Sequence, residues 1–374
     1  MQRILRATVD WWVFFSAAAI MTAGLFTMNS FSSENVQFDR QLFFVSAGLL
    51  LMFLFSFVDF RFLRRTGVLV VLFGASIFLL SLLFVLGHTA KGAESWFHLF
   101  GFSFQPSDLA KLVLILMLSK YFSRRHVEIA DIRHIFISGI YAFIPFVLIL
   151  VQPDFGSAIA LFFVWLGMSM VAGISKKHLA LLFLAAAVAG LFFWQYVFAP
   201  YQKARIINFI HPLTDVRGGG YNANQSMIAV GSGELWGKGV GYGTQSRLLF
   251  LPEFETDFIF AAFAEEWGFL GVALLLFLYG ILIWRLLFNA SIGETNFETL
   301  FAVGLSMFFM THIAVTIGMN MGVLPVTGIS LPLMSYGGSH IITESIGLGI
   351  LMGMRRYARA TSRESLSREF LGLS

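Results

Sequence analysis

The chain has 374 residues, of which 57% are hydrophobic and only 12% are charged, and its mean hydropathy is +0.79. A soluble domain carries about 25% charged residues, so this composition excludes an ordinary soluble protein. The absence of cysteine also excludes disulfides, thiolate catalysis and cysteine metal sites.

Apolar runs of about 20 residues recur along the whole chain, and each is long enough to cross a bilayer. They predict an all-α, polytopic membrane protein that forms one domain, 1–374. No cleavage site follows the first run, so we expect a retained helix and not a signal peptide. The ten expected spans are 11–30, 41–58, 67–87, 106–121, 134–151, 155–172, 178–198, 257–287, 298–320 and 338–354.

The distribution of charge predicts the orientation of these spans. Ten spans place both termini on one side, and most of the 25 Lys and Arg fall on that side, including those of the tail 355–374. An excess of positive charge marks the cytoplasmic side. We attribute the cytoplasmic arginine clusters to this topology and to contact with lipid head groups.

The Gly, Pro and uncharged polar residues gather in four outward connections, namely 91–111, 152–156, 199–256 and 322–339. The long loop 199–256 lies between the seventh and eighth spans. A transporter more often places its polar residues near the bilayer midplane, on broken helices in repeated halves, and we find no internal repeat. The sequence therefore predicts a site that opens outward.

An acidic stretch, FLPEFETDFIFAAFAEEWG, opens the eighth span. Proline is favoured in a first helical turn, so we predict a helix from Pro252 that places Glu253 and Asp257 on one face. Capping of a helix N-terminus explains Glu253 and Glu255 equally well. Asp257 stands where the apolar run begins, and an ionisable residue at such a depth is a functional candidate.

Two further acidic positions lie deeper in the same run. We expect at least one of Glu265 and Glu266 to pair with a basic or hydroxyl group inside the bundle. In the fourth span, Asp108 and Lys111 lie three residues apart on one helix face. Either the two residues form a local ion pair, or Lys111 is a cation presented to an anionic ligand such as a phosphate.

Asp154 lies in the short turn QPDFG between two spans, where turn chemistry explains the proline and glycine but not the acid. Arg205 either contacts phosphate or flanks a span. We predict that the irregular segment 327–339 forms a floor or wall of the site, because such backbone at membrane depth must be buried in protein or line a wet cavity. The glycines of 199–256 lack a P-loop pattern, and the histidines lack zinc spacing.

Several motifs, all in the family order, resemble the SEDS family (shape, elongation, division and sporulation), and the resemblance covers essentially the whole chain. They are Lys91-Gly92 with Trp96, Gln105-Pro106-Ser107 with Lys111, Gln152-Pro153-Asp154, Gln225-Ser226, Gly237-Lys238-Gly239, Leu251-Pro252-Glu253, Thr256-Asp257-Phe258-Ile259-Phe260, Thr327-Gly328, Leu331-Pro332 and Ser335-Tyr336-Gly337-Gly338-Ser339. The stretch 318–328 looks more like the elongation member, RodA, than the division member, FtsW.

The resemblance implies a peptidoglycan glycosyltransferase that polymerises lipid II at the outer face of the bacterial cytoplasmic membrane, during cell elongation and shape maintenance. A class B penicillin-binding protein is the implied partner, and no nucleic acid is expected. The chain departs from the family's pattern at Asp108, where Glu is usual, at Ser95 and Glu255, and at His340, where a second Ser is common.

The resemblance also places the family's essential acid at Asp257, as general base on the acceptor's 4-hydroxyl in an inverting displacement of undecaprenyl pyrophosphate. Asp257 alternatively holds a divalent metal, Mg or Mn, and no organic cofactor is implied. The expected substrate-binding residues are Lys111, Asp108, Asp154, Arg205, Glu253, Trp96, Ser335, Tyr336 and Ser339. The alternatives are a flippase of the lipid-linked precursor and a scaffold for the penicillin-binding partner.

Overall fold

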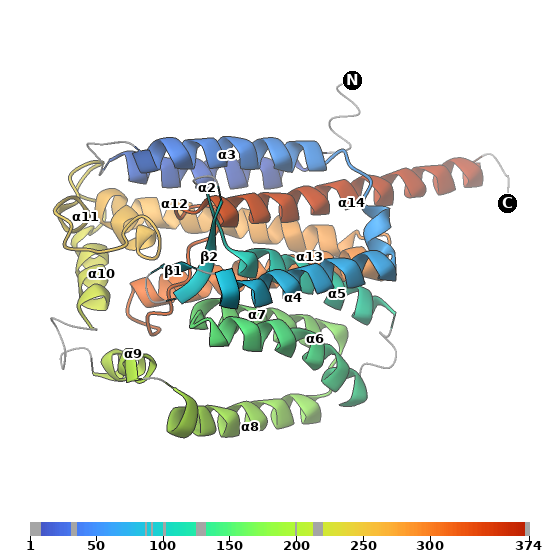
Figure 1. Cartoon of the computed structure of the whole chain (residues 1–374). Helices are drawn as coiled ribbons and strands as arrows, with labels where there is room; N and C mark the ends of the chain where they lie inside the picture. Colours follow the sequence, from blue (N-terminus) through green and yellow to red (C-terminus); the bar gives the residue numbers. More distant parts are fainter. Residues whose placement is uncertain are drawn as a thin grey trace.

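The structure is a computed structural model that describes residues 9–30, 36–86, 88–90, 93–99, 102–124, 132–198, 200–211 and 220–370. Ten long helices in this part of the chain match the ten predicted spans (Figure 1). They are α2 (Trp11–Asn29), α3 (Val36–Phe55), α4 (Thr66–Leu86), α5 (Pro106–Ser123), α6 (Ile132–Val151), α7 (Phe155–Ala172), α8 (Lys176–Phe192), α12 (Ile259–Ser291), α13 (Asn296–Asn320) and α14 (Gly338–Phe370).

Eight of these helices are long and apolar enough to cross a membrane, which supports the predicted multi-pass membrane protein. The other two, α5 and α14, carry charges along their length. Lys111 and Asp108 lie near the start of α5, and α14 runs on into the Arg-rich tail 355–370. Ionisable residues inside a span are unfavourable and tend to mark function, so the charged residues of α5 and α14 are functional candidates.

The connections contain smaller elements. The sequence did not predict the antiparallel sheet formed by β1 (His88–Ala90), β2 (Ala93–Leu99) and β3 (Phe102–Phe104). The loop after α8 holds three helices too short to span a bilayer, α9 (Pro200–Ile210), α10 (Tyr221–Ser232) and α11 (Thr244–Arg247). The 3₁₀-helix η1 (Phe60–Arg64) and the π-helix η2 (Phe193–Val197) complete the described elements.

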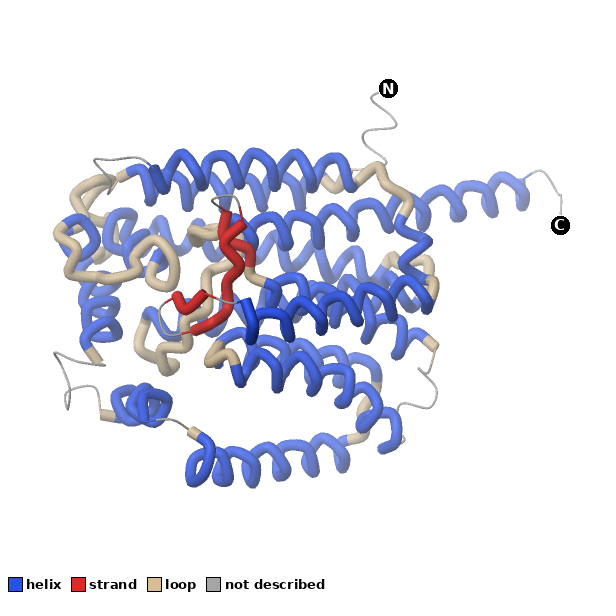
Figure 2. Tube along the Cα trace, viewed as in Figure 1, coloured by secondary structure: helices blue, strands red, loops and turns tan. Residues whose placement is uncertain are grey.

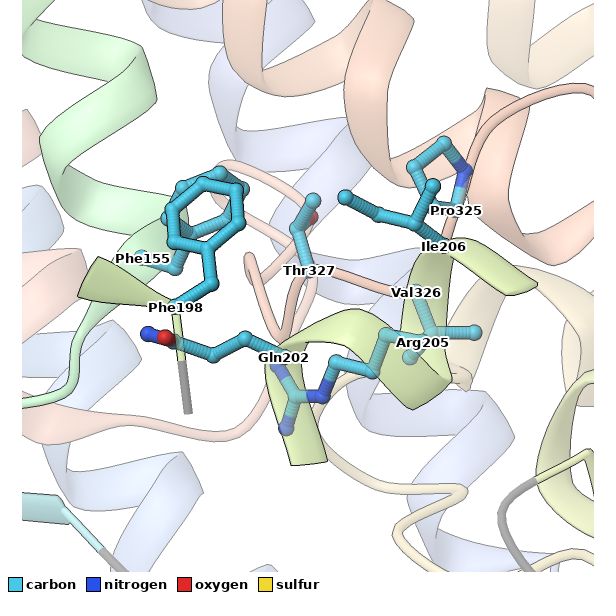
Figure 3. A pocket seen from close by; sticks show the side chains of 8 residues that line it. All are labelled: Phe155, Phe198, Gln202, Arg205, Ile206, Pro325, Val326 and Thr327. Carbon is cyan, nitrogen blue, oxygen red and sulfur yellow. The ribbon is translucent and has the colours of Figure 1, made fainter. Parts of the chain in front are cut away.

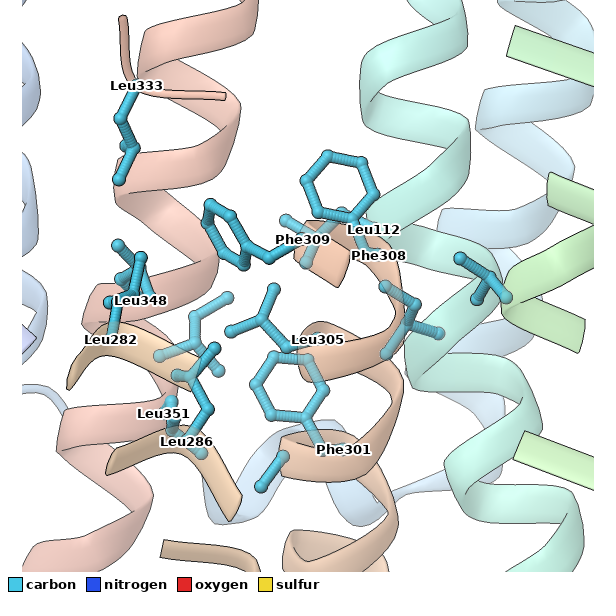
Figure 4. Close-up of a cluster of buried hydrophobic side chains, with 14 of the residues drawn as sticks. Leu112, Leu282, Leu286, Phe301, Leu305, Phe308, Phe309, Leu333, Leu348 and Leu351 are labelled. Carbon is cyan, nitrogen blue, oxygen red and sulfur yellow. The ribbon is translucent and has the colours of Figure 1, made fainter. Parts of the chain in front are cut away.

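The helices lie side by side, with α13 in the centre and α8 at one edge (Figure 1). In α13, 72% of the apolar window is buried within the protein, whereas in α8 none of it is. Leucine and phenylalanine side chains from α5, α12, α13 and α14 fill the middle of the bundle (Figure 4). This interdigitated centre fixes the helix ends, and the ends carry the candidate site.

The two ends of the bundle differ in the connecting elements and polar contacts that they carry. The strands and the loops around α10 and α11 lie toward one end, away from the C-terminal part of α14 (Figure 2). At the other end, the buried carboxylate of Asp10 accepts hydrogen bonds from Arg285 at 2.8 Å and Asn289 at 3.1 Å, and it pairs with Arg355. This cluster ties α2, α12 and α14 together at the end opposite the predicted site.

Candidate active site

The segment before α12 does not form the helix predicted from Pro252. The helix begins at Ile259, and residues 252–258 form turns. Glu253 adopts φ +55°, and its carbonyl oxygen accepts hydrogen bonds from the N–H groups of Thr256 and Phe258, both at 3.1 Å. A residue in the left-handed region interrupts a helical path, so Glu253 and Asp257 do not share a helix face.

Contacts from distant helices hold the backbone of this loop in place. Asn320 Nδ2, at the end of α13, donates to the carbonyl oxygen of Asp257 at 3.0 Å, and its Oδ1 accepts from Ala261 N–H at 3.1 Å. The Ser335 hydroxyl donates to Thr256 O at 2.7 Å, and Tyr336 N–H donates to the carbonyl of residue 255 at 2.8 Å. The predicted acid is therefore positioned by α13 and by the segment between α13 and α14.

The side chain of Asp257 is half-buried and faces a backbone segment that has little bulk. A Cβ atom added at Gly328 would lie 3.6 Å from Asp257 Oδ2. Gly328 itself adopts φ +77°, a conformation that favours glycine. Gly328, which lies between α13 and α14, therefore leaves space beside the Asp257 carboxylate.

A second group of predicted residues meets at the starts of α5, α7 and α14. Gln105 Nε2 donates to Asp154 Oδ2 at 3.0 Å, and Gln105 N–H donates to Ser339 Oγ at 3.1 Å. Asp154 also caps α7, because its Oδ1 accepts from Ser157 N–H at 3.0 Å. Ser339 in turn donates to Asp108 Oδ2 at 3.3 Å.

Lys111 is a buried ion-pair partner and not an exposed cation in this structure. Its side chain is 4% exposed, and Nζ lies 3.0 Å from Asp108 Oδ1 and 3.5 Å from His312 Nε2. Of the two predicted roles, the local ion pair is the one that the geometry supports. The prediction that Lys111 meets the ligand directly is not supported, because α13 and α14 cover it.

Arg205 is the exposed cation of the site. It lies on α9 and lines a pocket together with aromatic and aliphatic side chains of α7, α9 and the segment after α13 (Figure 3). The lining residues are Phe155, Phe198, Gln202, Arg205, Ile206, Pro325, Val326 and Thr327. Phe155 directly follows Asp154, and Thr327 directly precedes the glycine beside Asp257. The pocket therefore borders both groups of predicted residues.

The remaining predicted residues take different places. Trp96 is half-buried on β2, opposite His88, and so belongs to the sheet. Glu253 is exposed and accepts a hydrogen bond from Thr256 Oγ1 at 2.9 Å. Ser335 is buried and satisfied by backbone groups, so its position favours a supporting role over contact with substrate.

The two deeper glutamates bind the loop that follows α10. Glu265 accepts hydrogen bonds from Lys238 Nζ at 2.7 Å and from Thr244 N–H at 2.8 Å, and Glu266 accepts from Gly241 N–H at 2.6 Å. The predicted pairing with a basic or hydroxyl group is thus found. The partners lie in the loop and not inside the bundle.

The sequence analysis missed residues whose role depends on distant partners. Gln105 and Asn320 are such residues, as are His312 and Glu344. A signal existed for the last: polar residues four apart in an apolar span, as His340 and Glu344 are, predict a shared buried face.

The carboxylate of Asp257 is the group at this site that a divalent cation could bind. In the described part of the chain no three His, Asp or Glu side chains come together as a metal cage. Magnesium, however, usually keeps several waters and takes one or two carboxylates together with substrate phosphates. A single half-buried carboxylate beside a pocket with an exposed arginine suits that mode of binding. It does not provide the several ligands of a closed metal centre.

The family model FTSW_RODA_SPOVE, described as "Cell cycle protein", matches residues 2–360. The chain belongs to this family. The predicted SEDS membership is thereby confirmed, since the match takes in every element that carries the site.

Individual relatives of this FtsW/RodA/SpoVE-family protein agree. The chain is 38% identical over 277 residues to peptidoglycan glycosyltransferase MrdB of Escherichia coli K12, covering 74% of this chain and 75% of the relative. A chain from a structure of a peptidoglycan synthase complex aligns with TM-score 0.80 and 33% identity, over 93% of this chain and 98% of that chain. The crystal structure of Thermus thermophilus RodA aligns with TM-score 0.70 and 33% identity, covering 93% and 97%.

Proposed function

We propose that this protein is a peptidoglycan glycosyltransferase that polymerises lipid II into β-1,4-linked glycan chains. The observation that carries the proposal is the position of Asp257, a half-buried carboxylate on a loop fixed by Asn320 and Ser335, next to a pocket with an exposed arginine. The relatives named as peptidoglycan glycosyltransferases support the same reaction. The likeness of this chain to MrdB and RodA favours a role in cell elongation and shape.

The proposed reaction is a direct displacement. Asp257 takes the proton from the 4-hydroxyl of the acceptor sugar, and that oxygen attacks the anomeric carbon of the donor chain. The new C–O bond forms as the bond to undecaprenyl pyrophosphate breaks, so the configuration inverts from α to β. A carboxylate within hydrogen-bond reach of the hydroxyl is suited to this proton transfer.

Arg205 is the chain's candidate for binding the departing pyrophosphate. It is exposed in the pocket, whereas Lys111 is buried with Asp108. An arginine offers a planar fork of donors that matches phosphate oxygens. In the alternative that we propose for Asp257, its carboxylate instead holds Mg²⁺ or Mn²⁺, which would neutralise negative charge on the leaving group.

The proposed setting is the bacterial cytoplasmic membrane, with both termini in the cytoplasm and the active site outside. The predicted partner is a class B penicillin-binding protein, which the likeness to a chain of a peptidoglycan synthase complex supports. Lipid II and membrane lipids complete the expected ligands.

One observation favours the alternative of a precursor flippase. Ionisable residues lie deep between α5, α13 and α14, as a hydrophilic path would require. Those described in this cluster are nevertheless buried and paired with one another, which is the arrangement of a closed network and not of a path.

The deciding experiment compares the wild type with Asp257→Asn, each purified with the cognate penicillin-binding partner whose transpeptidase is blocked. Fluorescent lipid II and a divalent cation are supplied, and products are separated on a gel. We expect glycan chains from the wild type alone. A folded, partner-bound wild type that makes no chains would overturn the enzyme proposal, and equal chains from both would overturn the role of Asp257.

A further inference from the structure

Five ionisable side chains from three helices meet inside the bundle, and the proposed reaction uses none of them directly. Each is at most 5% exposed. They are Asp108 and Lys111 of α5, His312 of α13, and His340 and Glu344 of α14. The Phe308 ring packs against this cluster, with its centroid 4.2 Å from that of His312 and 6.0 Å from Lys111 Nζ. Unbalanced charge in such a place is strongly unfavourable, so the cluster must balance its own charge.

His312 is neutral and accepts from Lys111. Its Nδ1 lies 2.9 Å from the carbonyl oxygen of Phe308, which can only accept a hydrogen bond. Nδ1 therefore carries the proton, and Nε2 offers a lone pair to Lys111 Nζ at 3.5 Å. The ammonium group of Lys111 thus lies between this nitrogen and Asp108 Oδ1.

His340 stands between two carboxylates. Nδ1 lies 3.4 Å from Asp108 Oδ1, and Nε2 lies 2.9 Å from Glu344 Oε1. His340 Nε2 and Glu344 Oε1 form no aligned hydrogen bond, but they lie within ion-pair distance, as do Nδ1 and Asp108 Oδ1. A buried ring between two carboxylates balances their charge only as an imidazolium, so the geometry favours that form. The cluster then holds two positive groups, Lys111 and His340, against two negative groups, Asp108 and Glu344.

The other contacts of the two carboxylates are uncharged. Glu344 Oε2 accepts from Leu333 N–H at 2.7 Å, and Asp108 Oδ2 accepts from Ser339 Oγ. Tyr279, the titratable group that α12 presents nearby, donates its hydroxyl to Pro332 O. None of these three contacts alters the balance of charge.

We propose that His340 is a charged positioning residue: its imidazolium bridges Asp108 and Glu344 and so holds Lys111 and the start of α5 in place. Asp108 is joined through Ser339 and Gln105 to Asp154 at the edge of the pocket. The bridge therefore fixes the starts of α5, α7 and α14 where they border the site. Its effect on catalysis rests on the proposed function, whereas the balance of charge does not.

The test is a charge-balance cycle in the full-length protein, with His340→Gln, Glu344→Gln and the double variant. Each single variant leaves one unpaired charge in the bundle, and the double variant is neutral again. We expect each single variant to lose about tenfold or more in lipid II polymerisation and to unfold at a lower temperature in detergent. The double variant should recover most of the melting temperature, because its charge is balanced, but not polymerisation, because the bridge is still missing. His178→Gln on α8, outside the cluster, is the matched control and should behave as the wild type.

Recovery in the double variant distinguishes charge balance from packing, because removing a second polar group would not repair a packing defect. Losses of melting temperature that simply add, or single variants without any loss, would overturn the proposal. Recovery of polymerisation together with melting would overturn the positioning role, because the double variant has no bridge. If the wild type itself makes no glycan chains, the proposed function fails, and the melting temperatures still decide whether His340 and Glu344 are coupled.

Discussion

At the scale of single residues, burial separates two cations that the sequence presents as equivalent. Lys111 and Arg205 are both basic residues beside outward connections. In the structure Lys111 is covered by α13 and α14 and paired with Asp108, whereas Arg205 is exposed on α9 within the pocket. Substitution should therefore change different properties of the protein at the two positions.

Lys111→Met leaves Asp108 without its ammonium partner in an apolar setting, so it should lower the free energy of unfolding by about 3–5 kcal/mol. Arg205→Met removes a candidate phosphate contact from an exposed side chain. It should leave unfolding nearly unchanged and reduce polymerisation by about 100-fold. Thermal unfolding in detergent and the glycan gel measure the two effects. A stable, inactive Lys111→Met protein would contradict this assignment and return Lys111 to direct contact with substrate.

At the scale of elements, the loop after α10 is built against the start of α12. Gly237 adopts φ +79°, and a Cβ atom there would overlap the carbonyl oxygen of Glu266. Lys238 N–H and Gly239 N–H donate to the carbonyl oxygens of residues 265 and 266 at 2.9 and 3.0 Å. This close backbone contact leaves no room for a side chain.

Gly237→Ala should therefore destabilise the protein by more than about 1 kcal/mol, because alanine both clashes and resists a positive φ. The loop should separate from α12, and limited proteolysis should cut it faster than in the wild type. Gly231→Ala is the matched control, since no atom outside its own stretch of helix lies within 4 Å of the added Cβ and α10 is helical there. Equal protease resistance of the two variants would show that the loop does not need this contact.

The same elements show what the sequence could and could not predict. Hydropathy identified all ten long helices, because spanning a bilayer requires about 20 apolar residues in a row. The prediction of a helix from Pro252 was wrong, because Asn320 and Ser335, far along the chain, hold residues 252–258 in turns. The role of Lys111 stayed open for the same reason: its second partner, His312, is 201 positions away.

At the scale of the whole molecule, the candidate site and the Asp10 cluster lie at opposite ends of the bundle. The starts of α5, α7, α12 and α14 and the end of α13 share the site end, as an even alternation of spans requires. The buried ion cluster around Asp10, with the positively charged ends of α12 and α14, occupies the other. Together with the excess of positive charge there, this predicts a protein whose chemistry faces away from the cytoplasm.

The absence of native cysteine makes this orientation directly measurable with single introduced cysteines. Leu235, in the loop after α10, is 61% exposed, and Ser291, at the end of α12, is also exposed. A membrane-impermeant thiol reagent should label Leu235→Cys on spheroplasts and Ser291→Cys only after the membrane is opened. The reverse pattern would place Asp257 in the cytoplasm. Lipid II with its sugars outside could not then reach that carboxylate, so the same labelling experiment tests the orientation and the location of the proposed polymerase site.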